Sequence, residues 1–324
     1  MISQLSKASR LGIISLTAAS LFMAQATWAQ DFSAVEIKTE KVTGNIYMLT
    51  GRGGNIGVSA GSDGIFIVDD QFAPLTDKIK SAIGDIQSGD IDFVINTHWH
   101  GDHTGGNENL GKAGTTIVAH DRVRARMQQG GRDLDFRNPE PEASVPDSLP
   151  VITYNDELGL HLNGDAVRIY HAPRGHTDGD SIVHFPSSNV LHLGDLYFST
   201  GYPFVDRDSG GSLQGVIRAI KFALRLSDDD TKIIPGHGPL ADRSDLQRYY
   251  DMLVGVRDAV QSHIDRGHDL KQTMAAKPTS QWDEAWGEYF ISGDQITVVA
   301  WQSLSLDYAH QKPRRQRHGH GHQH

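Results

Sequence analysis

Short apolar runs separated by glycine and polar clusters follow one another closely between residues 40 and 100. Three of them, at 45–50, 55–59 and 64–68, are spaced as adjacent antiparallel strands. From 74 to 86 the apolar residues recur mostly at spacings of three and four, which predicts a helix with one buried face. A compact apolar run at 91–96 predicts a further strand, which ends in a cluster of polar residues.

The second half of the chain shows the same order of strand-like and helical patterns. Four strand-like runs are expected at 158–162, 166–172, 181–185 and 190–193, and helical patterns at 212–226, 244–264 and 294–310. Between the two β-rich parts, residues 132–150 contain four prolines and little periodicity, which predicts a long irregular loop. This alternation and the 34 glycines favour an α/β or all-β body over a helical bundle.

The amino terminus has the pattern of a signal peptide. Lys7 and Arg10 precede an apolar run, 11–26, that carries no charge, and small residues up to Ala29 offer cleavage sites. We expect residues 1–29 to be removed and the protein to be periplasmic or secreted. The alternative is a retained membrane anchor, but such anchors usually need about 20 apolar residues. No other stretch is long and apolar enough to span a membrane, so no stable insertion is expected after cleavage.

Composition narrows the chemistry. The chain has no cysteine, which excludes disulfides and thiolate metal ligands, so a metal must rest on histidine and carboxylate. Thirty basic against 40 acidic residues give a formal charge of −10, which argues against a nucleic-acid partner. We expect small-molecule substrates, and the sequence leaves the oligomeric state open.

The polar cluster after the strand at 91–96 has metal-ligand spacing. His98, His100, Asp102 and His103 fall within six residues, and in an extended loop the side chains of His98 and His100 point the same way. Two ligands on one side can share one metal ion. In α/β sheets, loops at strand ends are where ligands usually bind.

Three further ligand-type residues, His176, Asp195 and His237, each stand beside glycine and follow an apolar run. If the strand ends converge on one rim, seven such side chains would meet, which is enough for two ions. Imidazole with carboxylate suits zinc, although iron and manganese accept the same set. A purely structural role is the alternative, and the dense cluster with three downstream partners disfavours it.

These motifs together resemble the metallo-β-lactamase-fold superfamily over about residues 40–310. Its H-x-H-x-D-H motif stands at 98–103, and its later motifs resemble Gly175-His176-Thr177, Gly194-Asp195 and Gly236-His237-Gly238. The resemblance implies an α/β fold, an αβ/βα sandwich of two packed mixed β-sheets flanked by helices, with metals at one edge. It also implies that His98, His100 and His176 hold the first metal and Asp102, His103 and His237 the second, with Asp195 bridging both.

A dinuclear zinc site implies a hydrolytic reaction. Two zinc ions lower the pKa of a shared water towards about 7, so that a metal-bridging hydroxide attacks an acyl carbon, with Asp102 orienting it and passing on its proton. We expect a β-lactam-like cyclic amide, a lactone, an ester or a thioester as substrate. Asp195 stands where the best-known metallo-β-lactamase subclasses carry cysteine, and it resembles the bridging aspartate of thioesterases and lactonases. Phe198 stands where quorum-signal lactonases commonly carry tyrosine, which weakens the lactonase interpretation.

The predicted organisation is a signal peptide at 1–29, a hydrolase domain at 30–310 and a basic, histidine-rich tail at 311–324. The tail's composition cannot build a core, and it would serve either to collect zinc or to solubilise the protein. Two other functions stay open: a periplasmic metal-handling protein, which the tail supports, and mononuclear-iron persulfide or oxygen chemistry. The complete second-metal set with His103 and His237 speaks against a single iron.

Overall fold

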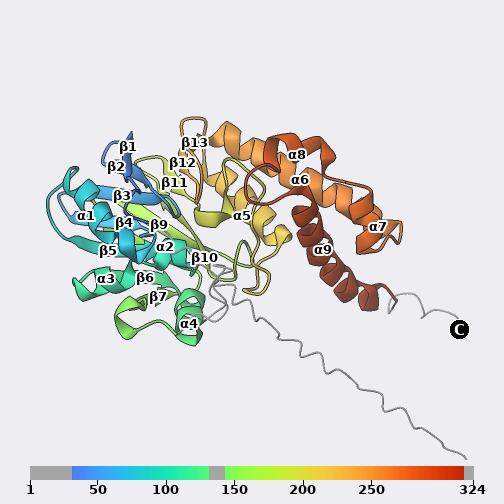
Figure 1. The fold of residues 1–324 in the computed structure, drawn as a ribbon, viewed down its shortest axis with the longest axis horizontal. Coiled ribbons are helices and arrows are strands. Elements are labelled where there is room, and N and C mark those ends of the chain that lie inside the picture. Colours follow the sequence, from blue (N-terminus) through green and yellow to red (C-terminus); the bar gives the residue numbers. More distant parts are fainter. Residues whose placement is uncertain (1–30, 131–142, 317–324) are drawn as a thin grey trace, which may run out of the picture. The chain divides into compact units, whose positions relative to one another are not determined.

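The first half of the chain builds a seven-stranded mixed sheet. Its strands lie in sequence order across the sheet (Figure 1): β1 (Lys38–Thr43), β2 (Ile46–Thr50), β3 (Ile56–Gly61), β4 (Gly64–Val68), β5 (Ile91–Asn96), β6 (Thr116–His120) and β7 (Ile152–Tyr154). Strands β1 to β4 pair antiparallel and β4 to β7 pair parallel. The three runs predicted as adjacent antiparallel strands are confirmed as β2, β3 and β4. The strand predicted at 91–96 is confirmed as β5. The prediction missed β1, whose polar, mostly exposed sequence is that of a sheet edge, and it also missed β6 and β7.

The second half builds a six-stranded sheet in the order β13 (Ala241–Asp242), β12 (Lys232–Ile234), β11 (Val190–His192), β10 (Asp180–Phe185), β9 (Asp165–Ala172) and β8 (Glu157–Leu162). All neighbours pair antiparallel except β11 and β12, which are parallel. The four predicted strands are confirmed as β8 to β11. Strands β12 and β13 have only three and two residues, too short to show a periodicity.

The two sheets pack face to face over a shared apolar core. Residues such as Met48, Phe66 and Ile95 from the first sheet meet Ile169 and Phe185 from the second, all nearly inaccessible to solvent. The rings of Phe66 and Phe185 stack across this interface with centroids 5.9 Å apart. Burying each such side chain stabilises the fold by about 1.5–3 kcal/mol. The packing of two inner sheet faces makes the body a sandwich.

Helices cover the outer faces of both sheets. The α-helices are α1 (Thr76–Gly84), α2 (Gly101–Thr104), α3 (Asn107–Lys112), α4 (Asp121–Gln129), α5 (Leu213–Leu226), α6 (Arg243–Asp265), α7 (Leu270–Ala275), α8 (Ser280–Trp286) and α9 (Gly293–Gln316), with 3₁₀ turns η1 (Ala73–Leu75), η2 (Pro146–Ser148) and η3 (Gly194–Leu196). Helix α1 buries its apolar face on the first sheet, whereas α5, α6 and α9 share a core with the second (Figure 1). The predicted αβ/βα sandwich of two mixed sheets is confirmed.

Local sequence explains where the long helices begin. Ser212 caps α5 by accepting a hydrogen bond from Gly215 N, and Asp242 and Asp245 form a capping box at the start of α6. Helix α9 continues to Gln316, so it ends beyond the domain boundary that the sequence suggested at residue 310.

This computed structural model describes the backbone of residues 31–130 and 143–316 and the side chains of α9 as far as residue 305. The predicted signal peptide, the first part of the 132–150 loop and the histidines at 318–324 lie outside the described residues. Within the described ranges, no helix combines the length and the apolar character needed to cross a membrane.

Candidate metal centre

The sheet topology brings several strand ends to one edge of the sandwich. Because β10 runs antiparallel to both β9 and β11, and β12 runs parallel to β11, strands β9, β11 and β12 all end on the same side. His176, Asp195 and His237 follow these three strands, and the H-x-H-x-D-H cluster follows β5. The structure brings all seven predicted ligand residues together: His98, His100, His176 and Asp195 in one group and Asp102, His103 and His237 in another.

The H-x-H-x-D-H segment is not one extended loop. His98 lies in a loop and His100 is the N-cap of α2, so the predicted extended geometry holds only for these first residues. The chain then turns, because His103 N and Thr104 N both donate hydrogen bonds to His100 O, at 3.0 and 3.1 Å. This single helical turn directs Asp102 and His103 to the second group instead of the first.

The first group consists of three buried imidazoles whose inner nitrogens converge. His100 Nδ1 lies 3.1 Å from His98 Nε2 and 2.8 Å from His176 Nε2. Asp195 Oδ2 approaches from one side, 3.8 Å from His98 Nε2 and 3.6 Å from His176 Nε2.

The outer nitrogens of the same three rings face polar partners. His98 Nδ1 lies 3.0 Å from Thr97 Oγ1, His100 Nε2 lies 3.1 Å from Asp206 Oδ2, and His176 Nδ1 lies 2.8 Å from Phe204 O. A carbonyl or carboxylate oxygen only accepts, so the protons of His100 and His176 occupy the outer nitrogens. The lone pairs on their inner nitrogens then point at one another, and a metal cation would stabilise this arrangement. Histidines that bind a metal usually have such hydrogen-bond partners on their outer nitrogens.

The second group pairs two imidazoles with a carboxylate. His237 Nε2 lies 3.2 Å from Asp102 Oδ2 and 3.4 Å from His103 Nε2, and the buried Phe198 ring stacks on His237 with centroids 5.2 Å apart. Asp195 Oδ1 lies 3.0 Å from His103 Nε2 and 3.4 Å from His237 Nε2. The two oxygens of one carboxylate therefore face different groups. Among the described residues, this buried Oδ1 has no polar partner besides these imidazole nitrogens, which fits a cation shared with them.

Charge is distributed unevenly between the two groups. Burial lowers the pKa of His176 to about 4 and that of His98 well below its usual range, so both rings are neutral at pH 7. Burial also acts against a charged His237, but the Asp195 and Asp102 carboxylates outweigh it and raise the pKa of His237 to about 9. In the metal-free protein, protons on the second group thus neutralise the carboxylates. Metal ions binding there would displace those protons.

Asp69, directly after β4, contacts the candidate site and was not included in the sequence prediction. Its side chain is fully buried, with Oδ1 2.7 Å from Thr97 N and Oδ2 2.7 Å from both Thr97 Oγ1 and His103 Nδ1. It thereby orients His103 directly and His98 through Thr97. The feature of the sequence that could have pointed to Asp69 is an Asp-Asp pair directly after a buried strand. The neighbouring Asn96 donates its amide to Asn107 Oδ1 and His103 O, whereas Thr97 supplies the contact with the His98 ring.

Asp206 is the second residue that the prediction missed. It lies in an irregular segment without a motif, yet it is buried, and its Oδ1 accepts a hydrogen bond from Ser209 N at 2.9 Å. Burial alone would raise the pKa of Asp206, but hydrogen bonds from His100 and Ser209 lower it to about 2. The ionised carboxylate therefore holds the His100 ring in place.

Replacing Asp206 by asparagine is expected to weaken the first metal site. The substitution keeps the size of the side chain but removes the charge that the His100 Nε2–H faces, and such partners usually contribute about 10- to 100-fold in metal affinity. Zinc titration of chelator-treated protein, with the exposed Asp229→Asn as control, measures the effect. An affinity equal to that of the unmodified protein would remove Asp206 from the site.

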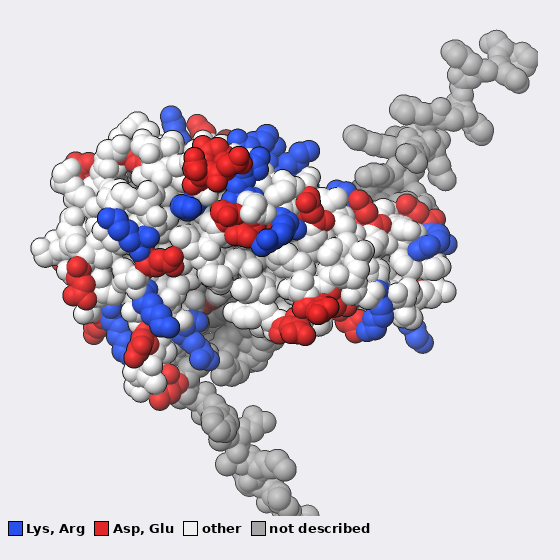
Figure 2. All heavy atoms as spheres, turned by 90° about the horizontal axis from the view of Figure 1, so that it is seen from above, with Lys and Arg blue, Asp and Glu red and all other residues white. Residues whose placement is uncertain are grey.

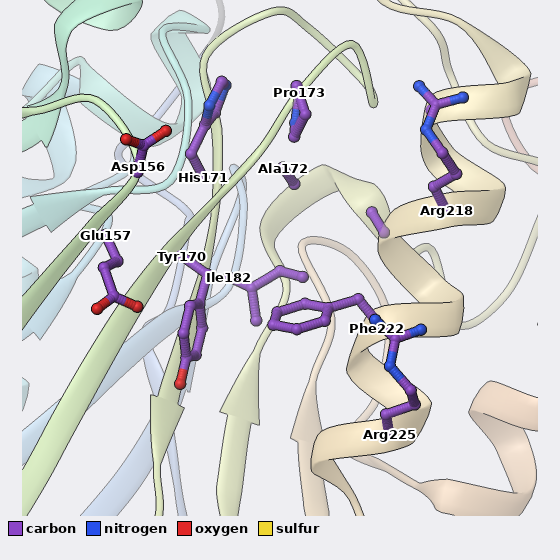
Figure 3. Close-up of a pocket in the computed structure, with 12 residues that line it drawn as sticks. Asp156, Glu157, Tyr170, His171, Ala172, Pro173, Ile182, Arg218, Phe222 and Arg225 are labelled. Atoms are coloured by element: carbon purple, nitrogen blue, oxygen red, sulfur yellow. The ribbon is translucent and has the colours of Figure 1, made fainter.

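A separate cavity of about 390 Å³ lies between the second sheet and α5 (Figure 3). Tyr170 and Phe222 meet edge to face inside it with ring centroids 5.1 Å apart, and Asp156 and Arg218 lie on opposite walls. Its lining includes none of the seven ligand residues, so this cavity is distinct from the metal centre.

Sequence comparison identifies relatives of this arrangement. The profile of the metallo-beta-lactamase superfamily matches residues 40–237. The lactamase-like protein aptB of Emericella nidulans is 29% identical over 47% of this chain and 40% of its own length. The hydroxyacylglutathione hydrolase of Nitrosococcus oceani is 29% identical over 45% of this chain and 48% of its own length. The chain thus spans about half the length of these curated relatives or less.

Solved structures agree on the fold. A metallo-beta-lactamase from Pontibacter korlensis superposes with a TM-score of 0.57 at 17% identity, covering 68% of this chain and 99% of that protein. At this identity the likeness concerns architecture alone, and the profile match over more than half of the chain establishes the relationship in sequence. With its two-sheet sandwich and its edge cluster of histidines and aspartates, the chain belongs to the metallo-beta-lactamase superfamily.

Proposed function

We propose that this protein is a zinc-dependent hydrolase that holds two metal ions and cleaves a small acyl substrate. The observation that carries this proposal is the position of Asp195, whose two carboxylate oxygens face two separate sets of metal-binding side chains. Two zinc ions so placed would lower the pKa of a shared water towards about 7 and stabilise negative charge on the substrate's carbonyl oxygen. A mononuclear iron site would use only the first group of side chains and would leave the second group without a metal ion.

The residues of the chain have distinct tasks in this reaction. Three neutral imidazoles would supply the first site, and His103 and His237 with Asp102 the second. Asp102 has the most accessible side chain of the seven, 28% exposed against 18% for His237, so it faces the space where substrate and water enter. There it would orient the attacking water and pass its proton towards the leaving group.

The substrate class follows from the site and from the relatives. A hydroxyacylglutathione hydrolase acts on a thioester, and the other named relatives are lactamase-like, so we propose a thioester, ester or cyclic amide of modest size. On the face shown in Figure 2, basic and acidic side chains are interspersed over the surface, which favours small molecules over nucleic acid. Because the sequence also predicts a signal peptide, we propose that the protein acts in the periplasm or outside the cell.

Metal analysis tests the dinuclear centre. Protein purified without chelator is expected to hold about two zinc ions, and His103→Ala about one, because this substitution removes a ligand of the second group only. His161→Ala, on the exposed side of β8, is the matched control. Inductively coupled plasma spectrometry reports the content, and one iron per unmodified chain would refute the proposal. A panel of thioesters, esters, lactones and β-lactams then identifies the class that turns over.

A further inference from the structure

Two large aromatic side chains are exposed between α8 and α9. Tyr289 and Phe290 have 59% and 53% of their surfaces accessible. Leaving such a side chain in water forgoes about 1.5–3 kcal/mol that burial would contribute. Adjacent exposed apolar groups commonly mark a place where another molecule binds.

Ring contacts connect this pair to the first metal-binding group. The centroid of Phe290 lies 5.9 Å from that of Phe204, and Phe204 in turn lies 5.6 Å from His176 and 6.2 Å from His100. The carbonyl oxygen of Phe204 also accepts the hydrogen bond from His176 Nδ1. Phe204 and Phe290, together with the exposed Tyr289 that precedes Phe290 in the chain, form a surface, here called the aromatic wall, that starts at the metal centre and leads outward.

Contacts within the protein hold the aromatic wall in position. Tyr202 N donates to Trp286 O at 2.8 Å, and the Tyr202 hydroxyl donates to Asp283 Oδ1 at 2.9 Å. Gly201 lies so close to Tyr289 that a Cβ there would stand 3.0 Å from the Tyr289 Cβ. These contacts dock α8 and the segment after it onto the residues that precede Phe204. A surface that is already ordered loses little entropy when a substrate binds.

Part of the aromatic wall lies beyond the region shared with the family. The superfamily profile matches residues 40–237, whereas Tyr289 and Phe290 come from the helical segment that follows. The shared region supplies the ligand residues, and the later segment supplies this additional surface beside them. Substrate preference can therefore differ here from that of relatives with the same metal-binding motifs.

We infer that the aromatic wall is a subsite for an apolar, preferably aromatic, acyl group of the substrate. The inference rests on the proposed hydrolase function and deepens it. With the acyl carbon at the two groups of metal-binding side chains, an aryl substituent would lie on Phe204 and Phe290. Contacts between aromatic rings contribute about 0.5–1.5 kcal/mol beyond the free energy of burying their surface. The leaving group would extend towards Asp102 and His237, the more accessible ligands. Small or charged acyl groups would gain no binding energy from the aromatic wall.

The kinetic test compares a phenylacetyl with an acetyl thioester of the same thiol in the zinc-loaded protein. We expect Phe290→Ala to lower the ratio of their kcat/KM values about 3- to 10-fold, mainly through KM of the phenylacetyl substrate. Phe290→Leu, which keeps apolar bulk without a ring, should lie between. Val151→Ala removes an apolar group that is 70% exposed on the surface next to β7, and its ratio should equal that of the unmodified protein. An unchanged ratio in Phe290→Ala would overturn the inference.

A binding measurement separates this inference from the hydrolase proposal. NMR titration of the chelator-treated protein with phenylacetate is expected to give a Kd about 3- to 10-fold weaker in Phe290→Ala than in the unmodified protein. Equal values would overturn the subsite even if both thioesters are hydrolysed. If the Kd weakens as expected but neither thioester turns over, the subsite stands and thioester hydrolysis is refuted.

Discussion

Asp195→Asn is expected to lose most of its turnover while keeping its fold. The wild-type carboxylate places negative charge between the two groups, with Oδ1 3.0 Å from His103 Nε2 and Oδ2 3.6 Å from His176 Nε2. The amide keeps the size but loses the charge, so metal affinity should fall, and more strongly at the second group. We expect kcat to fall by about 100- to 1000-fold, as when other charge-stabilising groups are removed from active sites.

Three measurements separate catalysis from folding in this variant. Zinc content and kcat should both drop. The chelator-treated variant should still unfold in one cooperative transition, but at a lower midpoint, because His103 and His237 lose the buried negative charge that they face at 3.0 and 3.4 Å. The exposed Asp229→Asn controls for the loss of one negative charge. Near-normal turnover with two zinc ions bound would refute the bridging role.

Asp69→Asn is expected to damage both stability and the second metal site. Asp69 accepts hydrogen bonds from Thr97 N, Thr97 Oγ1 and His103 Nδ1, each at 2.7 Å. An amide in its place presents an NH₂ group to at least one of these donors, and a buried unsatisfied donor costs about 1–3 kcal/mol. His103 also loses the charge that fixes its tautomer, so zinc affinity should fall about 10- to 100-fold.

Chemical denaturation with and without chelator measures the two effects of Asp69→Asn separately. Lower stability in chelator reports the lost hydrogen bonds, and a smaller gain on adding zinc reports the weakened site. Asp77→Asn, an exposed residue of α1, is the matched control. Stability and zinc gain equal to those of the unmodified protein would show that His103 is oriented by something other than Asp69.

Short-range patterns explain why so much of the sandwich was predictable. The strands β2 to β5 and β8 to β11 and the helices α5 and α6 carry their own periodicity, glycine turns and capping residues, all of which operate within a few positions. β12 and β13 lack such a signal and exist because neighbouring strands pair with them. That pairing energy depends on residues that are distant in the chain.

Residue type and local spacing alone pointed to the seven ligand-type residues, because imidazole and carboxylate chemistry belongs to each side chain wherever it lies. The tertiary structure alone decided how they are grouped. One helical turn places Asp102 and His103 in the second group. Asp195 faces both groups because β11, which precedes it, lies in the sheet between the strands that lead to His176 and to His237. The contact of Asp206 with His100 joins residues 106 positions apart, and Phe290 reaches the metal centre only by packing on Phe204. No local pattern encodes such distances, since they arise only when the two sheets and the carboxy-terminal helices pack together.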